Sequence, residues 1–277
     1  HDTQKDHKAL DYYIDLFNHS HKKFDPLKTL TVYIDGGEPT RIPCLYDLCK
    51  YIKNNHYNII LKLGTNGSQS LDYYLNLSKY VDTFVFSLHF DWVKIKPLIK
   101  KISSLHFKLG RSRVNTQVMA EINHFRNCKL VCEFFTKSKF WFNLCSINYD
   151  NGNSESIRKN ILYDLHWQKL ISKYGNPNQD YDMLLDGKPF SSPDLKNIIR
   201  SNNEGRYTYS KGFFKDWICY APSKVLQLEK GVLSTTCELV SYGTPESNVP
   251  FKETIKCDGR SCNCVASIRT KKYLPQD

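Results

Sequence analysis

The segment Leu30-Thr31-Val32-Tyr33-Ile34-Asp35-Gly36-Gly37-Glu38-Pro39 decides the fold class of this chain. Its first five residues form a short apolar run rich in β-branched side chains, which is typical of a buried strand. The two glycines allow a tight turn, and proline favours the first position of a helix. The segment therefore predicts a strand, a turn and a helix in succession.

The same order of elements repeats along the first half of the chain. The expected strands are centred on Val32, Ile60, Val85, Thr116 and Phe142, about 25 to 31 residues apart, which is the length of one strand–helix unit. Helices are expected at 6–20, 45–52, 69–80, 93–102 and 121–133. Such units form a parallel sheet, either curled into a barrel or doubly wound, and ligands bind at the carboxyl ends of its strands.

The second half of the chain has a different character. Residues 150–215 are polar and contain one good helical candidate at 161–173, and the tail has a hairpin pattern around Gly231. We therefore expect three parts, namely an α/β domain at 1–149, a connecting region with helices at 150–215 and a small cysteine-rich β-hairpin domain at 216–277.

Composition limits the function classes. The net charge is +11, from 39 Lys and Arg against 28 Asp and Glu, but the lysines are scattered and form no basic block. We therefore do not expect a nucleic-acid interface, although the charge prompts a nucleic-acid-modifying enzyme as a third alternative. No apolar stretch is long enough for a membrane span and no signal peptide pattern begins the chain, so a cytoplasmic location is expected.

Polar turns follow three consecutive expected strands. They are Gly36-Gly37-Glu38-Pro39, Thr65-Asn66-Gly67-Ser68, and Ser87 with His89. This ordered series, over roughly residues 29–120, resembles the radical S-adenosylmethionine (SAM) superfamily. The resemblance implies a partial (β/α)6 TIM-like barrel whose first strand is missing from the chain.

The resemblance also implies a set of SAM-binding residues. These are Gly36, Gly37, Glu38, Pro39, Thr65, Asn66 and Ser87, and we add Asn115, which shares one face of its expected strand with Arg113 and Gln117. The glycine turn would face the ammonium group of SAM, with the negative charge of Glu38 nearby. No catalytic residue can be named.

Each of these residues also has a structural interpretation. Glu38 is suited to capping the helix that follows it, Asn66 with Gly67 to a tight turn, and Ser87 to a helix N-cap. His89 either faces a substrate or packs against the sheet. These alternatives explain the single motifs but not their ordered series.

The chain lacks the motif that holds the catalytic cluster in the superfamily. That 4Fe–4S cluster is bound by a Cys-x3-Cys-x2-Cys loop, whereas here Cys128-x3-Cys132 is followed by Phe135 where the third cysteine is required. We interpret the chain as N-terminally truncated, with the loop upstream of His1, and expect it to be inactive as written. The alternative is a degenerate, metal-stabilised relative that acts as a binding protein.

Ten cysteines are present, and half of them cluster in the tail. Such clustering in an intracellular chain favours metal ligation. The tail resembles the SPASM and Twitch domains of radical SAM enzymes, which implies an auxiliary 4Fe–4S cluster; a structural zinc site is the alternative. The candidate ligands are Cys219, Cys237 and Cys257 with one of Cys262 and Cys264, and the other five cysteines (44, 49, 128, 132 and 145) are expected to be small buried apolar residues.

The expected function follows from the resemblance. In complete form the enzyme would reductively cleave SAM to a 5′-deoxyadenosyl radical and abstract hydrogen from a peptide or a small polar substrate. The electron would come from a flavodoxin- or ferredoxin-like donor.

Overall fold

The computed structural model describes the first half of the chain almost continuously and the second half in short segments. The described residues are 10–24, 27, 29–91, 93–146, 165–174, 184–185, 188–189, 199–201, 207–209, 218–219, 226–229, 232–235, 241–244, 247, 249–250, 252, 254–257 and 272–273.

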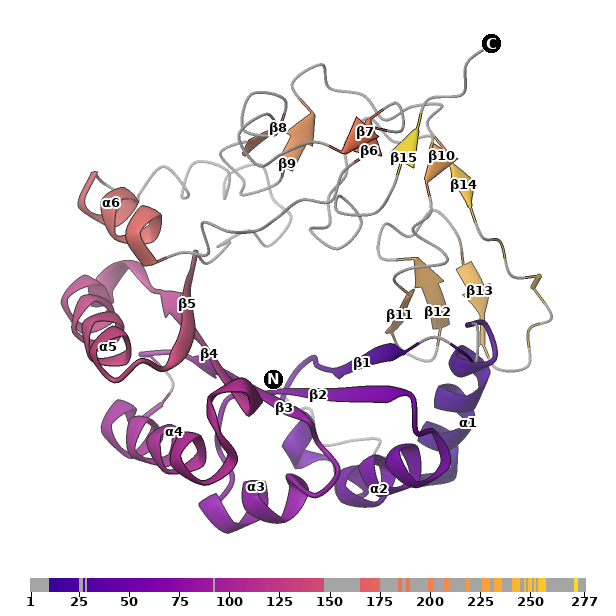
Figure 1. Ribbon diagram of the computed structural model, residues 1–277, viewed down its shortest axis with the longest axis horizontal. Helices are drawn as coiled ribbons and strands as arrows, with labels where there is room; N and C mark the ends of the chain where they lie inside the picture. Colours follow the sequence, from indigo (N-terminus) through magenta and orange to yellow (C-terminus); the bar gives the residue numbers. More distant parts are fainter. Residues whose placement is uncertain are drawn as a thin grey trace. The chain divides into compact units, whose positions relative to one another are not determined.

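Five parallel strands form one sheet in the order in which they follow along the chain (Figure 1). They are β1 (Leu30–Ile34), β2 (Ile59–Thr65), β3 (Thr83–Leu88), β4 (Val114–Ala120) and β5 (Trp141–Ser146). A doubly wound sheet reverses its strand order at a switch point, and this sheet does not. The expected α/β class with a parallel sheet is confirmed, and the order is that of a partial TIM-like fold.

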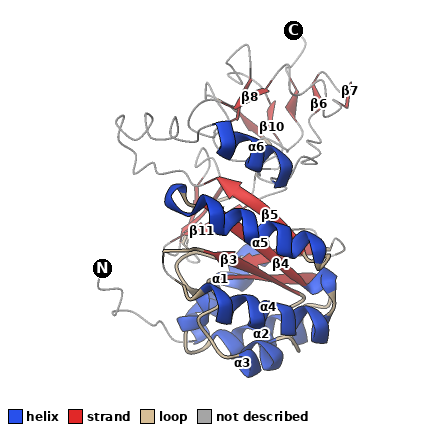
Figure 2. Cartoon of the chain, turned by 90° about the vertical axis from the view of Figure 1, so that its left-hand side faces the viewer, coloured by secondary structure: helices blue, strands red, loops and turns tan. Residues whose placement is uncertain are grey.

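Helices α2 to α5 lie along one face of this sheet (Figures 1 and 2). The helical segments are α1 (Leu10–His21), α2 (Leu45–Asn55), α3 (Leu71–Leu77), α4 (Ile95–Leu109), α5 (Phe125–Lys137) and α6 (Leu165–Tyr174), with short 3-10 turns η1 (Pro39–Arg41), η2 (Arg111–Arg113) and η3 (Ile122–His124). Among the described helices, none combines the length and the apolar character needed to cross a membrane.

Three helices begin later than the sequence pattern predicts, among them α4, which starts at Ile95. The α3 helix starts after Ser70, whose side-chain oxygen accepts a hydrogen bond from the backbone N–H of Tyr73 at 3.2 Å. Serine is a favoured N-cap, so the residue before it stays outside the helix. The α5 helix begins at Phe125 because η3 comes between it and β4.

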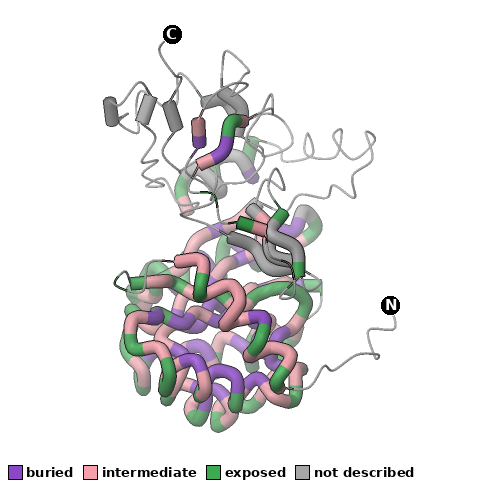
Figure 3. The backbone as a smooth tube through the Cα atoms, turned by 90° about the vertical axis from the view of Figure 1, so that its right-hand side faces the viewer, coloured by how far each residue is buried: buried purple, intermediate pink, exposed green. Residues whose placement is uncertain are grey.

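The two faces of the sheet differ in burial. On β4 the side chains of Val114, Thr116, Val118 and Ala120 are buried, whereas Asn115, Gln117 and Met119 alternate with them and are half-buried. The apolar face packs against the helices, where Tyr74 meets the rings of Phe84 and Phe86 with centroids 5.7 and 5.2 Å apart. Figure 3 shows the buried positions in the interior of the part with the parallel sheet and the exposed ones on its surface. On β4 the opposite face carries Asn115 and Gln117 together with Met119.

Three of the five cysteines expected to be buried pack as apolar residues, whereas Cys44 and Cys145 are half-buried, contrary to the prediction. Cys49, Cys128 and Cys132 are fully buried, as predicted. Burial raises the pKa of each of these thiols to about 12. Cys128 and Cys132 are therefore protonated core residues of α5.

Contacts divide the chain into two compact units, one with the parallel sheet and a second that contains short strands. One three-stranded antiparallel sheet has the order β14 (Ile255–Lys256), β10 (Ile218–Cys219), β15 (Lys272–Tyr273), and another has the order β11 (Leu226–Glu229), β12 (Val232–Thr235), β13 (Ser241–Gly243). Two further hairpins pair β6 (Leu184–Leu185) with β7 (Lys188–Pro189), and β8 (Ile199–Ser201) with β9 (Tyr207–Tyr209). The hairpin expected around Gly231 is β11–β12. The expected boundaries near 150 and 216 lie outside the described residues.

One histidine of the helical layer is buried without a polar partner. His106 of α4 is 5% exposed, and neither ring nitrogen has a hydrogen-bond partner among the described residues. Its ring stacks on Phe140 with centroids 4.2 Å apart. Burial, with a smaller contribution from Arg111, lowers the pKa of His106 to about 4.

This histidine should make the fold sensitive to acid. Between its ordinary pKa of 6.5 and its folded pKa of about 4, the unfolded state binds a proton that the folded state does not. Stability should therefore fall as the pH drops through this window, by about 2 kcal/mol at pH 5 from this residue. We expect His106→Phe to lose less stability than the wild type between pH 7.5 and pH 5, measured by urea unfolding. His166→Phe, at an exposed position of α6, is the control, and equal losses in all three proteins would contradict the prediction.

A candidate ligand pocket at the carboxyl ends of the strands

The turn after β1 requires its two glycines. Gly36 and Gly37 have φ angles of +93° and +56°, in the left-handed region that most side chains avoid. The carboxylate of Asp35 accepts a hydrogen bond from the backbone N–H of Gly36 at 2.8 Å, which fixes the start of the turn. Pro39 then occupies the first position of η1, as the sequence predicts.

Glu38 joins the ends of the first two strands. Its Oε1 accepts hydrogen bonds from the backbone N–H and the hydroxyl of Thr40, at 3.1 and 2.5 Å, and from the hydroxyl of Thr65 at 2.8 Å. Its Oε2 accepts from the backbone N–H of Asn66 at 2.6 Å. The capping interpretation of Glu38 is thus confirmed, but the same carboxylate also ties β1 to β2.

The turn after β2 is held from several sides. Its Thr65 hydroxyl lies 3.0 Å from the hydroxyl of buried Tyr74 and accepts from the backbone N–H of Gly67 at 3.1 Å. Lys101 of α4 donates to the carbonyl of Gly67 at 2.6 Å and to that of Gln69. Gly67 has a φ of +77°, and a Cβ there would overlap the side chain of Leu98. Only glycine fits this position.

These turns surround a cavity of about 370 Å³. It lies at the ends of β1, β2 and β3, where a parallel sheet places its ligands, and its size falls in the range of small-molecule sites. The lining residues are Asp35, Gly37, Thr65, Asn66, Ser68, Ser87, His89 and Val93. Seven of these eight residues are polar or glycine, so the cavity suits a polar ligand.

Another cavity of about 420 Å³ has a different setting. It is lined by Arg111, Ser112, Phe140 and Trp141, at the amino ends of β4 and β5. Because ligands of parallel sheets bind at the opposite edge, we take the cavity at the carboxyl ends as the candidate site.

The structure brings together four of the predicted SAM-binding residues, namely Gly37, Thr65, Asn66 and Ser87. Gly36, Glu38 and Pro39 support the turn but do not line the cavity. The N-cap interpretation of Ser87 is wrong, because Ser87 lies within β3 and α4 begins only after Lys94. Asn66 both lines the cavity and accepts a hydrogen bond from the backbone N–H of Ser68 at 2.9 Å, as a turn residue does.

Asn115 does not line the cavity. It pairs with Val85 in the sheet, while Gln117 pairs with Ser87. Asn115 therefore lies two residues deeper along the strands than the cavity. The sequence pattern predicts that Arg113 shares the face of Asn115, but Arg113 lies in η2, before β4 begins. Its guanidinium donates to the carbonyls of Ser78 and Val81, at 2.5 and 2.6 Å, just after α3.

Two functional candidates escape the sequence patterns. The first is Asp35, which lines the cavity. Gly64 lies beside it, and a Cβ at this position would lie 2.7 Å from the Asp35 carboxylate and 2.9 Å from the Tyr33 hydroxyl, so the position suits glycine. The carboxylate of Glu121 is the second candidate, and its Oε1 accepts a hydrogen bond from Nδ1 of His89 at 3.0 Å. Alternation along β1 places Asp35 on the polar face, but no local pattern links His89 to a residue 32 positions away.

The fold and the site together define an α/β protein with a polar ligand pocket at the carboxyl edge of a parallel sheet. No model of a protein family matches the chain, and no curated protein matches it. Similar solved structures include one described as a histidine-tagged "anSMEcpe with bound AdoMet", at 14% sequence identity and a TM-score of 0.43, covering 82% of this chain and 68% of that chain. Similarity at this level does not establish a shared family, so the interpretation of the pocket depends on its own residues.

We expect Glu38→Gln to destabilise the protein. The amide replaces one acceptor oxygen with an NH2 group that faces other donors, which leaves buried donors unpaired and should cost about 1–3 kcal/mol. Urea unfolding followed by circular dichroism measures this loss. Glu133→Gln, in an exposed pair with Lys129 on α5, is the control and should change stability by less than about 0.5 kcal/mol. Equal effects of the two substitutions would show that Glu38 does not hold the strand ends together.

Proposed function

We propose that this chain is a radical SAM-type protein and that the cavity at the carboxyl ends of β1, β2 and β3 binds SAM. The observation that carries the proposal is the convergence of three strand-end turns on one polar cavity. SAM presents an ammonium, a carboxylate, a sulfonium and a ribose. A lining with one carboxylate, several hydroxyls and exposed backbone suits such a ligand.

The contacts favour Asp35 as the partner of the SAM ammonium group. Both oxygens of Glu38 already accept hydrogen bonds within the protein, whereas Asp35 lines the cavity and uses one oxygen for the N–H of Gly36. The backbone of Gly37 lies beside it at the cavity. We assign Ser87 and Asn66, on the neighbouring strand ends, to the carboxylate or the ribose of SAM.

When bound together with a reducing 4Fe–4S cluster, SAM supplies a 5′-deoxyadenosyl radical that removes a hydrogen atom from a substrate, here a peptide or a small polar molecule. The 277 residues contain no Cys-x3-Cys-x2-Cys motif, so we expect the chain alone to bind SAM without cleaving it. The same observation favours the second candidate, a non-catalytic binding protein. A flavodoxin- or ferredoxin-like donor belongs to the first candidate, and the net charge of +11 suits an acidic partner.

Calorimetric titration of the chain with SAM tests the pocket. We expect saturable binding that Asp35→Asn and Ser87→Ala each weaken by about tenfold or more, because each removes a group that would meet a charged or polar part of SAM. Ser104→Ala is the matched control, since this half-buried serine of α4 donates to the carbonyl of Lys100 in its own helix. Absence of SAM binding, or equal affinity in all variants, would refute the assignment.

Two of the five tail cysteines lie in the described residues. Cys219 on β10 is buried, and Cys257 directly after β14 is half-buried. Cys219 pairs with Ile255, so alternation places Cys257, two residues further on, on the same face of these adjacent strands. Cys237, Cys262 and Cys264 lie outside the described residues. We propose that Cys219 and Cys257 are two ligands of an auxiliary 4Fe–4S cluster, which needs four thiolates.

Anaerobic reconstitution with iron and sulfide tests this site. We expect visible charge-transfer absorption in the wild type and its loss in Cys219→Ala. Cys145→Ala, which removes a half-buried thiol of β5, should leave the absorption unchanged. Tight zinc binding without any iron uptake would instead identify a structural zinc site.

A further inference from the structure

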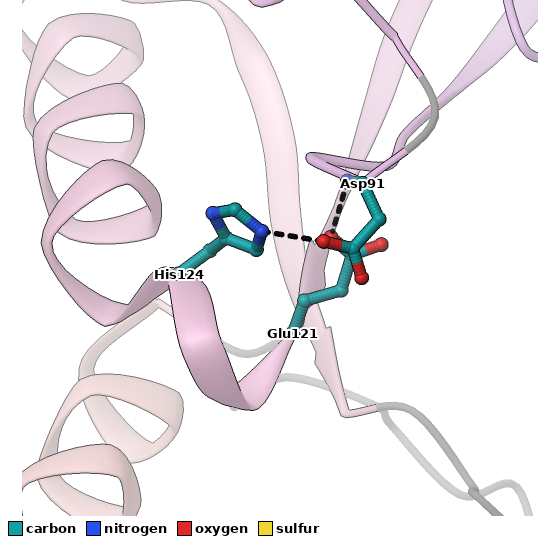
Figure 4. Close-up of side chains that lie close together, drawn as sticks. All are labelled: Asp91, Glu121 and His124. Carbon is teal, nitrogen blue, oxygen red and sulfur yellow. Dashed lines mark hydrogen bonds and ion pairs between the residues drawn. The ribbon is translucent and has the colours of Figure 1, made fainter.

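Four polar side chains meet beyond the carboxyl ends of β3 and β4. His89 and Asp91 follow β3, and Glu121 and His124 follow β4. Figure 4 shows Asp91, Glu121 and His124 turned toward one another. One donor atom from each of these three residues lies within 4.8 Å of the others. This separation is small enough for one ion to contact all three after modest movement.

The Glu121 carboxylate is fixed in place by the backbone. It is 4% exposed, and its Oε2 accepts hydrogen bonds from the N–H groups of Phe90 and Asp91 at 2.7 and 3.0 Å. Its Oε1 is turned to the ring of His89 at 3.0 Å. One oxygen is therefore held by two backbone N–H groups and the other by His89, so a cation that binds Oε1 takes the place of the His89 hydrogen bond.

The imidazole of His124 is oriented in a similar way. Its ring stacks on Phe90, with centroids 5.5 Å apart and planes 19° apart. The side-chain amide N–H of Asn127 faces Nδ1 at 3.4 Å, so Nδ1 is the acceptor and the Nε2–H donates to the Asp91 carboxylate, 2.6 Å away. A cation at Nε2 therefore takes the place of the Nε2 proton, which can move to Nδ1 when the Asn127 amide turns its oxygen toward that nitrogen.

The charges of the cluster also point to a cation. Among the described residues, the ion-pair partners of Asp91 and Glu121 are histidines, and no Lys or Arg reaches either carboxylate. A histidine balances a carboxylate only when it is protonated, whereas one divalent cation balances both carboxylates together. Burial of Glu121 makes such compensation more valuable.

We propose that Asp91, Glu121 and His124 bind a first-row divalent cation. Two carboxylate oxygens and one imidazole nitrogen suit Mn²⁺ or Zn²⁺ and leave coordination positions open. None of its three ligands is a cysteine. His89 lines the cavity and contacts Glu121, so a single side chain links the ion to the candidate ligand pocket.

Mn²⁺ is the probe that tests the proposal, because thiolates of the tail select softer metals. Equilibrium dialysis of the full chain, with free Mn²⁺ measured by its paramagnetic resonance signal, counts the bound ions. We expect one Mn²⁺ per wild-type chain and an affinity lowered by more than about tenfold in Asp91→Asn and in His124→Asn. Zn²⁺ should displace that ion.

The variants keep the result interpretable. Asp91 has a 54% exposed side chain, so Asp91→Asn should fold as the wild type does, which circular dichroism verifies. Glu133→Gln removes an exposed carboxylate elsewhere on α5 and should bind Mn²⁺ like the wild type. Absence of bound Mn²⁺ in the wild type, or equal binding in Asp91→Asn and His124→Asn, would overturn the proposal. SAM titration uses other residues, so the two proposals fail separately.

Discussion

The carboxylate of Glu38 is the interaction on which the site depends. Both oxygens accept hydrogen bonds, and the donors come from the turn after β1 and from the end of β2. Beyond the end of a parallel strand, the sheet no longer offers acceptors to the backbone N–H groups. The N–H groups of each turn therefore need another acceptor. One charged group meets that need for two strands at once. Because charge-assisted hydrogen bonds are strong, it holds Gly37 and Asn66 at the same edge of one cavity.

The singly wound sheet explains why further polar groups collect at this edge. Each parallel strand delivers its last residues to the same side, and alternation directs every second side chain away from the helices. Ser87 and His89 extend this face of β3, and Glu121 extends that of β4. The pocket and the Asp91–Glu121–His124 cluster are therefore neighbours through His89, although their residues lie far apart in sequence.

Local sequence patterns are sufficient for the elements but not for distances between them. The β1 strand matches its predicted bounds because a β-branched run ends at a glycine turn. The sequence pattern assigns Asn115 to the pocket from its face alone, and only the register shows that it lies too deep. The sequence pattern also assigns Glu38 to SAM. It does not show that the Glu38 carboxylate already accepts hydrogen bonds from Thr65 and Asn66, because these partners come from another strand. The Glu121 anchor depends on backbone N–H groups, which no side-chain pattern reveals.

The distribution of charge at this edge bears on what binds there. The chain as a whole carries a charge of +11, yet Asp35, Glu38, Asp91 and Glu121 all follow strand ends of the same sheet. Lys101, which reaches the turn after β2, is committed to two carbonyls. The edge is thus locally acidic within a basic protein. Such a field favours cationic groups over anionic ones, which is consistent with an ammonium at Asp35 and a divalent ion at Glu121.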